Sequence, residues 1–303
     1  FLSGICHLIL RNSPLAPNVA FIEEAGQLPL AQGVCAGLVG AGSVLMFGDD
    51  MQMPPVFTMD ISEEPLAKSL FASFRETHPR HVKMLTTSYR LNEELCGIIG
   101  ESFYTTEEGT KLRSCQEARD RRFNLENGKA NSSKAVSSAL TPDNSFVWVK
   151  SEANNSRSLN EKEAEFTAEI LAECLRRGLE AEDVAAVTPF RRQAARIRSL
   201  LESKIPDLKE FPIIDTVERV QGLTVELVIV SVCASDPEYI SSVSEFLLSP
   251  NRLNVSLSRA RTKAILVASD SIFEILPANY RTFLAQGKWK SLIEKASYAY
   301  DLD

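Results

Sequence analysis

The sequence has few features that would place it in a membrane, a zinc protein or a disulfide scaffold. No apolar run approaches the ~20 residues of a membrane-spanning helix, because charges, Gly and Pro interrupt every hydrophobic stretch. The six cysteines include no CxxC pair, and only three histidines are present, which argues against a zinc site. The opening FLSGICHLILRN has no initiator Met and no basic leader. We therefore expect an intracellular protein, cytoplasmic or nuclear, without a membrane partner.

The composition is close to that of an average globular protein. The 303 residues are 44% hydrophobic and 24% charged, which suffices for a packed core and favours two domains. The formal net charge of -7 provides no global attraction for polyanions. A nucleic-acid surface would therefore have to be a local basic patch.

Short aliphatic runs bounded by turn residues alternate with helical patterns. This alternation predicts an α/β fold in which the runs form buried parallel strands. The expected strands are residues 19–22, 44–47, 146–149, 184–187, 227–232 and 264–267, and clear helical patterns cover 161–177 and 191–204.

The domain boundary is expected near residues 78–82. This divides the chain into a first domain over 1–80, a second over 81–290 and a C-terminal tail over 291–303. Residues 105–145 are rich in Ser, Asn, Lys and Arg and have few large apolar side chains. They are interpreted as a mobile insertion or surface excursion.

Two polar motifs follow predicted strands of the first domain. VAFIEEAGQ places Glu23 and Glu24 at a strand's carboxyl end, where open α/β sheets bind ligands, and paired carboxylates there suit magnesium-nucleotide chemistry. VLMFGDDMQMPPV places Asp49 and Gln52 in a similar turn. Taken alone, each motif also fits an ordinary solvated strand end or tight loop.

Three further motifs lie in the second domain. LTTSYRLNEEL carries Arg90, DTVERVQGLTVEL carries Gln221 and Gly222, and NRLNVSLSRAR carries Arg259 and Arg261. Arginines from a second domain can stabilise charge on a transferring phosphoryl group. For LTTSYRLNEEL taken alone, an ordinary exposed Arg is the alternative.

In order and in type, EEAGQ, GDDMQMPP, SYR, DTVERVQG and NRLNVSLSRAR resemble motifs II to VI of superfamily 1 helicases. The resemblance is to the branch that includes the nonsense-mediated-decay helicase, senataxin and the replication helicase-nucleases, and it spans residues 19–269. It implies two RecA-like domains with parallel sheets and flanking helices. It also implies ATP and Mg²⁺ as cofactors, single-stranded DNA or RNA as partner, and movement driven by ATP hydrolysis.

The resemblance assigns roles to matching residues. Glu24 would be the general base, Glu23 would hold Mg²⁺ through water, and Gln52 would sense the γ-phosphate with support from Asp49. Arg90 and Arg259 would bind the γ-phosphate across the interdomain cleft, with Arg261 in a supporting role. Gln221 and Gly222 would approach the nucleotide. Thr188 and Thr216 would contact the nucleic-acid backbone. Apart from the resemblance, the basic residues Arg191, Arg192, Arg196, Arg198 and those between 111 and 134 are candidate phosphate contacts, with an ordinary solvated face as the alternative.

Two positions depart from the family pattern. Glu23 replaces the usual magnesium-associated Asp, and Thr224 replaces a Glu that the family uses toward the nucleotide sugar, while Glu226 is expected in the wrong register to substitute. Because of these departures, a second hypothesis remains: the chain is a catalytically degenerate relative that binds nucleic acid or acts as a scaffold. A nuclease based on residues 206–209 is a further alternative.

The sequence has no glycine-rich phosphate loop with a Lys and a following hydroxyl, and the nearest imitation, Gly128-Lys129-Ala130, lacks the hydroxyl. We therefore expect the chain to begin partway through the first motor domain and to lack ATPase activity by itself. Its missing partner would be the N-terminal part of the same motor. The incomplete first sheet should then expose strand edges and apolar surface.

Overall fold

The computed structural model describes residues 18–37, 43–57, 68–104, 111–126, 132–152 and 155–302, and of residues 35–37 and 298–300 it describes the backbone alone. Gly128-Lys129-Ala130 lies outside these ranges. The chain divides into two units, residues 1–85 and residues 86–303. Within the described ranges, no helix has the length and hydrophobicity that crossing a bilayer requires.

The first unit contains a two-stranded parallel sheet and two short helices. Residue Val19 pairs with Ser43 and Ile22 with Met46, which aligns the carboxyl ends of the two strands. Its elements are β1 (Val19–Ile22), α2 (Leu30–Gly37), β2 (Ser43–Met46), α3 (Leu70–Thr77) and the 3₁₀ helix η2 (Pro79–His81).

The two strands of this unit are not buried, contrary to the prediction. The side chains of Phe21 and Leu45 are 68% and 46% exposed. A parallel strand becomes buried when layers cover both of its faces, and in the described part of this unit β1 and β2 pair only with each other. The apolar strand surface expected for this part of the chain is therefore observed.

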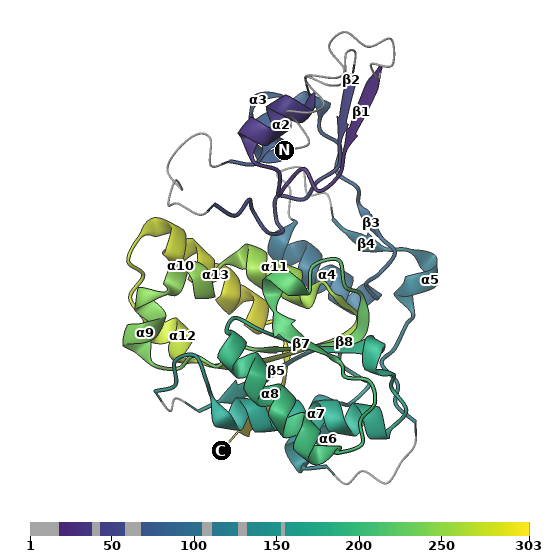
Figure 1. Cartoon of the computed structure of the whole chain (residues 1–303), viewed down its shortest axis with the longest axis vertical. Helices are drawn as coiled ribbons and strands as arrows, with labels where there is room; N and C mark the ends of the chain where they lie inside the picture. The colour runs from purple at the N-terminus through teal and green to yellow at the C-terminus, as the bar shows by residue number, and fades with distance from the viewer. Residues whose placement is uncertain are drawn as a thin grey trace. The chain divides into compact units, whose positions relative to one another are not determined.

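The second unit is built on a six-stranded parallel sheet with strand order β10-β5-β9-β8-β6-β7 (Figure 1). All carboxyl ends of these strands consequently lie at one edge of the sheet. This arrangement confirms the α/β, RecA-like fold with parallel strands. The strands are β5 (Phe146–Ser151), β6 (Val184–Thr188), β7 (Ile213–Thr216), β8 (Val225–Ser231), β9 (Ala260–Ser269) and β10 (Ser297–Leu302), and a separate parallel pair joins β3 (Thr87–Ser88) to β4 (Arg113–Ser114).

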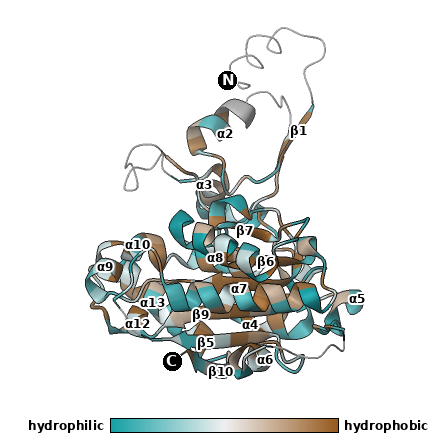
Figure 2. Cartoon of the chain, turned by 60° about the horizontal axis from the view of Figure 1, so that its bottom comes forward, coloured by the Kyte–Doolittle hydropathy of each residue, from teal (hydrophilic) through white to brown (hydrophobic). Residues whose placement is uncertain are grey.

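Helices cover both faces of the sheet (Figure 1). Helices α6, α7 and α8 pack on one face, and α4, α11 and α13 pack on the other. Figure 2 shows hydrophobic colour on the strands and hydrophilic colour on outer parts of the helices. The helices are α4 (Glu93–Phe103), α5 (Gln116–Arg119), α6 (Lys134–Ala139), α7 (Glu161–Arg176), η3 (Ala181–Asp183), α8 (Arg191–Lys204), η4 (Val217–Arg219), α9 (Pro237–Ser242), α10 (Ser244–Leu247), α11 (Pro250–Leu257), α12 (Ser271–Glu274) and α13 (Tyr280–Ile293).

The described parts of the polar segment 105–145 contribute buried side chains to the core, so their interpretation as a surface excursion is wrong. Phe123, Leu125, Val136 and Leu140 are buried in the same cluster as the sheet and helices α7 and α8. Each such side chain contributes roughly 1.5–3 kcal/mol by leaving water. A few well-placed apolar residues therefore anchor a segment whose average composition is polar.

The C-terminal residues also form part of the fold. The segment 291–303, expected as a tail, includes the end of α13 and the strand β10, which pairs with β5 at the edge of the sheet. The sequence SYAYDL of β10 has only a weak alternation of hydrophobic and polar residues. It could not be recognised as a strand from the sequence, because its pairing with β5 depends on the fold.

A buried carboxylate connects the strand ends to helix α7. Glu163 accepts hydrogen bonds from the hydroxyls of Ser151 on β5 (2.7 Å) and Ser231 on β8 (2.8 Å), and from the amide of Cys233 (2.9 Å). Gln193 on α8 donates to Ser231 (3.0 Å) and so joins the network. Burial raises the pKa of Glu163 to about 7, although these donors oppose the shift.

We predict that this group makes the protein less stable as pH rises. The pKa of Glu163 is higher in the folded state than its ordinary value of 4.5, so the unfolded state loses the proton first. The contribution of Glu163 is fully present below pH 4.5 and decreases by about 3 kcal/mol by pH 7. Glu163→Gln should lack this loss in thermal unfolding between pH 4.5 and 8. Exposed Glu165→Gln on the same helix is the control, and identical pH profiles for wild type and Glu163→Gln would refute the assignment.

Candidate nucleotide and nucleic-acid sites

The acidic motif of the first unit forms a turn immediately after β1. Glu23 and Glu24 are exposed, and Glu24 accepts a hydrogen bond from the Gln27 amide (2.8 Å). The backbone of Glu24 has a φ of 50°, in the left-handed region that costs a non-glycine residue about 1–2 kcal/mol. Strained backbone of this kind is concentrated at functional sites.

The second motif of this unit lies directly beside the first. The Ala25 amide donates to the Phe47 carbonyl (2.9 Å), and the Phe47 amide donates to the Ile22 carbonyl (2.8 Å), so the turns after β1 and β2 remain together. A Cβ on Gly26 would lie 2.6 Å from the carbonyl oxygen of Asp49, and only glycine permits this approach. Asp49 in turn accepts a hydrogen bond from the Gln52 amide (2.8 Å). The first unit thus brings Glu23, Glu24, Asp49 and Gln52 to one end of its sheet.

In the second unit, the SYR motif forms a turn held by its own hydroxyl. The Ser88 oxygen accepts hydrogen bonds from the backbone amides of Arg90 (3.4 Å) and Leu91 (3.2 Å). Arg90 Nη1 donates to the carbonyl of Ser258 (2.9 Å), so the guanidinium lies against the turn that precedes β9. The described residues provide no ion pair for Arg90.

Arg90 lines a cavity of about 540 Å³ in this unit, together with Tyr89, Arg121, Thr224, Glu226 and Arg261. Arg261 is paired with Glu226 (3.0 Å) and lies 3.6 Å from Asp183. Burial, and then the charge of Arg261, lower the pKa of Arg90. A guanidinium that is desolvated beside a like charge, without a carboxylate, favours binding of an anion.

Glu226 lines this cavity together with Thr224, although the sequence places it two positions beyond the family's Glu. Thr224 precedes β8 and Glu226 is the second residue of that strand. The pairing of β8 with β9 shifts register between Val225 and Leu227, so regular alternation does not apply at Glu226. The cavity therefore has a hydroxyl and a carboxylate beside its arginines.

Asn92 holds the backbone around these arginines. It is fully buried and caps helix α4 by accepting from the Leu95 amide (3.0 Å). Its backbone amide donates to the Arg261 carbonyl (2.9 Å), and its Nδ2 lies 3.2 Å from the Arg121 carbonyl. Arg90 is two residues away in the chain. One buried side chain thus fixes the segments that carry all three arginines.

The structure does not bring every predicted residue into this cavity. Arg259 is 3% exposed and donates to the carbonyls of Val255 (3.0 Å) and Leu223 (3.4 Å). Gly222 adopts a φ of 82°, which suits glycine, and it follows Gln221. The amide nitrogen of Gln221 is buried without a hydrogen-bond partner in the described residues.

The predicted nucleic-acid residues gather at the carboxyl ends of β6 and β7, where Thr188 and Thr216 are paired in register. Both threonines are buried, whereas Arg191 and Arg192 are exposed at the start of α8.

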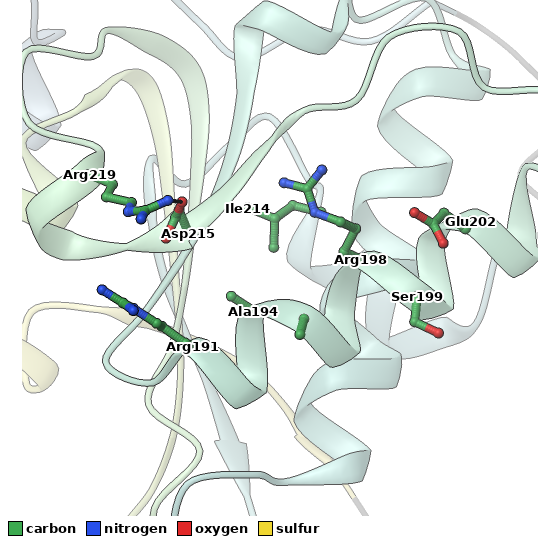
Figure 3. Close-up of a pocket in the computed structure, with 9 residues that line it drawn as sticks. Arg191, Ala194, Arg198, Ser199, Glu202, Ile214, Asp215 and Arg219 are labelled. Carbon is green, nitrogen blue, oxygen red and sulfur yellow. Dashed lines mark hydrogen bonds and ion pairs between the residues drawn. The ribbon is translucent and has the colours of Figure 1, made fainter.

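Arg191 lines a second cavity of about 330 Å³, in which Arg191 and Arg198 extend from α8 and Arg219 is paired with Asp215 (Figure 3). Glu202 also lines it. This cavity shares no residue with the cavity around Arg90.

Other predicted basic contacts are engaged elsewhere. Arg196 forms an ion pair with Glu161 on α7. Residues 206–209 lie in the loop after α8, and among the described residues no three Asp, Glu, His or Cys side chains gather closely enough to hold a metal ion.

Sequence reasoning included Arg121 only among the basic residues between 111 and 134, as a nucleic-acid contact, and it did not identify Asn92. Arg121 lies in the polar segment and belongs to no recognised motif. Asn92 follows the SYR motif by two residues and precedes two glutamates, a pattern that signals a helix N-cap and nothing more. Its contacts with the other segments depend on tertiary structure.

Comparisons with known proteins identify the family. A family profile described as AAA domain (AAA_12) matches residues 66–271. The DNA replication ATP-dependent helicase/nuclease JHS1 of Arabidopsis thaliana is 30% identical over 88% of this chain and 20% of its own length. The corresponding helicase/nuclease dna2 of Schizosaccharomyces pombe is 27% identical over 99% of this chain and 22% of its own length.

Among solved structures, the PRRSV helicase is 18% identical, with a TM-score of 0.40 over 86% of this chain and 37% of that chain. The present chain spans about a fifth of the length of the two curated relatives. The profile covers more than half of the chain. The chain therefore belongs to the AAA domain family, within the superfamily 1 helicases of the branch that includes senataxin and the replication helicase-nucleases.

Proposed function

We propose that this chain is part of an ATP-dependent helicase that couples ATP hydrolysis to movement along single-stranded nucleic acid. The observation that carries the proposal is the cavity around Arg90, because a desolvated guanidinium without a carboxylate fits a phosphate group. The relatives named above are DNA replication helicase/nucleases, which favours DNA over RNA as the strand.

The residues of the two units supply complementary chemistry for a triphosphate. Mg²⁺, when bound with the nucleotide, neutralises phosphate charge. Glu23 would hold the hydrated ion, and Glu24 would accept the proton of the attacking water. Gln52, fixed by Asp49, would respond to the terminal phosphate.

In the second unit, Arg90 and Arg259 would stabilise the negative charge that develops on the transferred group. The unpartnered Gln221 nitrogen, beside Gly222, is a donor that a nucleotide could satisfy.

The nucleic acid would contact the carboxyl edge of the second unit. Thr188, Thr216, Arg191 and Arg192 would provide backbone contacts, and such contacts bind a strand without reading its bases. We infer an intracellular location, cytoplasmic or nuclear, which the four unpaired buried cysteines at positions 96, 115, 174 and 233 support.

The first prediction from the proposed function concerns ATP turnover by the full-length gene product. Single-stranded DNA or RNA should stimulate turnover, and Glu24→Gln should reduce it by about a hundredfold or more because a general base is lost. Exposed Glu76→Gln, which removes only an ion pair with Lys68, should leave it unchanged. Strand binding without turnover in the wild type would favour the degenerate, scaffolding alternative suggested by Glu23 and Thr224.

A second prediction concerns the close contact between the two motifs of the first unit. Gly26→Ala should push the Asp49 turn away, lowering the free energy of unfolding by about 1–3 kcal/mol and reducing turnover. Gly287→Ala on α13 is the control, because no atom lies within 4 Å of its added Cβ. Turnover and thermal unfolding equal to wild type in Gly26→Ala would contradict the contact.

A third prediction uses two arginines of helix α8. Arg191→Gln should weaken single-strand binding and reduce the slope of log K against log salt by about 0.7, the value for one phosphate contact. Arg196→Gln should change neither quantity, because Arg196 is paired with Glu161. Equal salt slopes for the two variants would remove Arg191 from the nucleic-acid surface.

A further inference from the structure

We propose that Arg121 is an additional phosphate-binding residue, which contacts the terminal phosphate of ATP beside Arg90. The inference rests on the proposed function and concerns a residue outside the helicase motifs. Arg121 lies between α5 and α6, in the segment whose composition had suggested a surface excursion. It lines the same cavity as Arg90, Thr224 and Arg261.

The guanidinium of Arg121 lies close to the SYR turn. Its Nη1 is 3.3 Å from the carbonyl oxygen of Arg90 and 3.4 Å from that of Tyr89. Both contacts are at the long end of the hydrogen-bond range, and the described residues give Arg121 no ion pair. A guanidinium has five N–H donors, so most donors of Arg121 remain available to a ligand.

The cavity concentrates positive charge that its own residues do not balance. Three arginines line it, and the single carboxylate, Glu226, is paired with Arg261. Arg90 and Arg121 therefore share the cavity without a carboxylate of their own. Like charges that line one cavity cost free energy, which an anion bound there recovers.

The framework holds Arg121 in this position through buried contacts. Asn92 binds the Arg121 carbonyl, and the same Nδ2 lies 2.9 Å from the Ser145 hydroxyl and 3.2 Å from the Thr262 carbonyl. The next residues along the chain, Phe123 and Leu125, are buried in the core. The Arg121 amide donates to the Ala118 carbonyl (3.2 Å), so the backbone of Arg121 is held on both sides, unlike that of an arginine on a solvated loop.

The observations favour a nucleotide phosphate over a nucleic-acid phosphate. The predicted strand contacts gather at β6, β7 and α8, in a cavity that shares no residue with this one (Figure 3). Arg121 instead adjoins Arg90, to which the resemblance assigns the γ-phosphate.

The test measures ATP, ADP and single-stranded DNA binding by the full-length protein. Arg121→Gln should weaken ATP binding by about tenfold or more, as expected for a lost charged hydrogen bond, with ADP and DNA binding changed by less than about twofold. Arg122→Gln is the matched control, because the exposed neighbour does not line the cavity. Thermal unfolding establishes that each variant is folded.

Two further variants separate direct contact from positioning. In an Arg90→Ala background, Arg121→Gln should weaken ATP binding again, whereas a residue acting only through Arg90 would have no further effect. Arg121→Lys keeps the charge and should bind ATP better than Arg121→Gln. If Arg121→Gln does not fold, Arg121→Lys is compared with the wild type and with Arg122→Gln. Weaker binding of ATP alone supports the assignment, and unchanged ATP binding overturns it.

Several results would overturn the assignment. These are wild-type ATP affinity in Arg121→Gln, an equal loss for ADP, a loss for DNA instead of ATP, or no loss in the Arg90→Ala background. A wild-type protein that binds no ATP would refute the proposed function and this inference together. A wild-type protein that binds ATP while Arg121→Gln is unaffected would refute the inference alone.

Discussion

The buried side chain of Asn92 is the constraint on which the anion cavity of the second unit depends. Three arginines repel one another, and flexible loops would separate them. The hydrogen bonds of Asn92 to the carbonyls of Arg121 and Arg261 oppose that separation, and its cap on α4 fixes its own position. A buried amide without hydrogen-bond partners costs about 1–3 kcal/mol. Separating the segments that carry the three arginines would leave the Asn92 amide without partners, so this cost opposes the separation.

A second buried polar group, Glu163, fixes loops at the carboxyl ends of the strands. Glu163 joins the ends of β5 and β8 to the first turn of α7, and Gln193 extends the network to α8. Parallel strands place their carboxyl ends at one edge, but they do not fix the loops that follow. The network fixes these loops, at the cost of desolvating a carboxylate whose pKa burial raises to about 7.

The sequence predicted elements with strong periodicity, because periodicity depends on local burial. The helix at Arg191–Lys204 and the strand at Val19–Ile22 have the expected bounds. Burial of β1 could not be predicted, since it depends on the layers that cover a strand. The segment 105–145 was misinterpreted because composition averages over residues, whereas the core needs only Phe123, Leu125 and their few apolar neighbours.

For the candidate site, motif order identified the chemistry and tertiary contacts determined the geometry. SYR and SRAR are recognisable because each is contiguous, and Arg121 is not, because only folding brings it to the cavity. The contacts of Lys263 likewise could not be read from the sequence, because they form only in the folded structure. It is fully buried on β9, and its ammonium binds the carbonyls of Thr141 (2.7 Å) and Asn144 (2.6 Å).

Burial lowers the pKa of Lys263 to about 8, so the contact with the segment before β5 is made at a desolvation cost. The segment that carries Arg121 is therefore attached to the sheet at both of its ends, by Asn92 near Arg121 and by Lys263 near Asn144. Charged and polar groups are expensive to bury, and a chain retains them where position matters more than stability. Asn92 contacts the backbone of two arginines of the cavity, which connects the cost of burying this group to the binding of an anion.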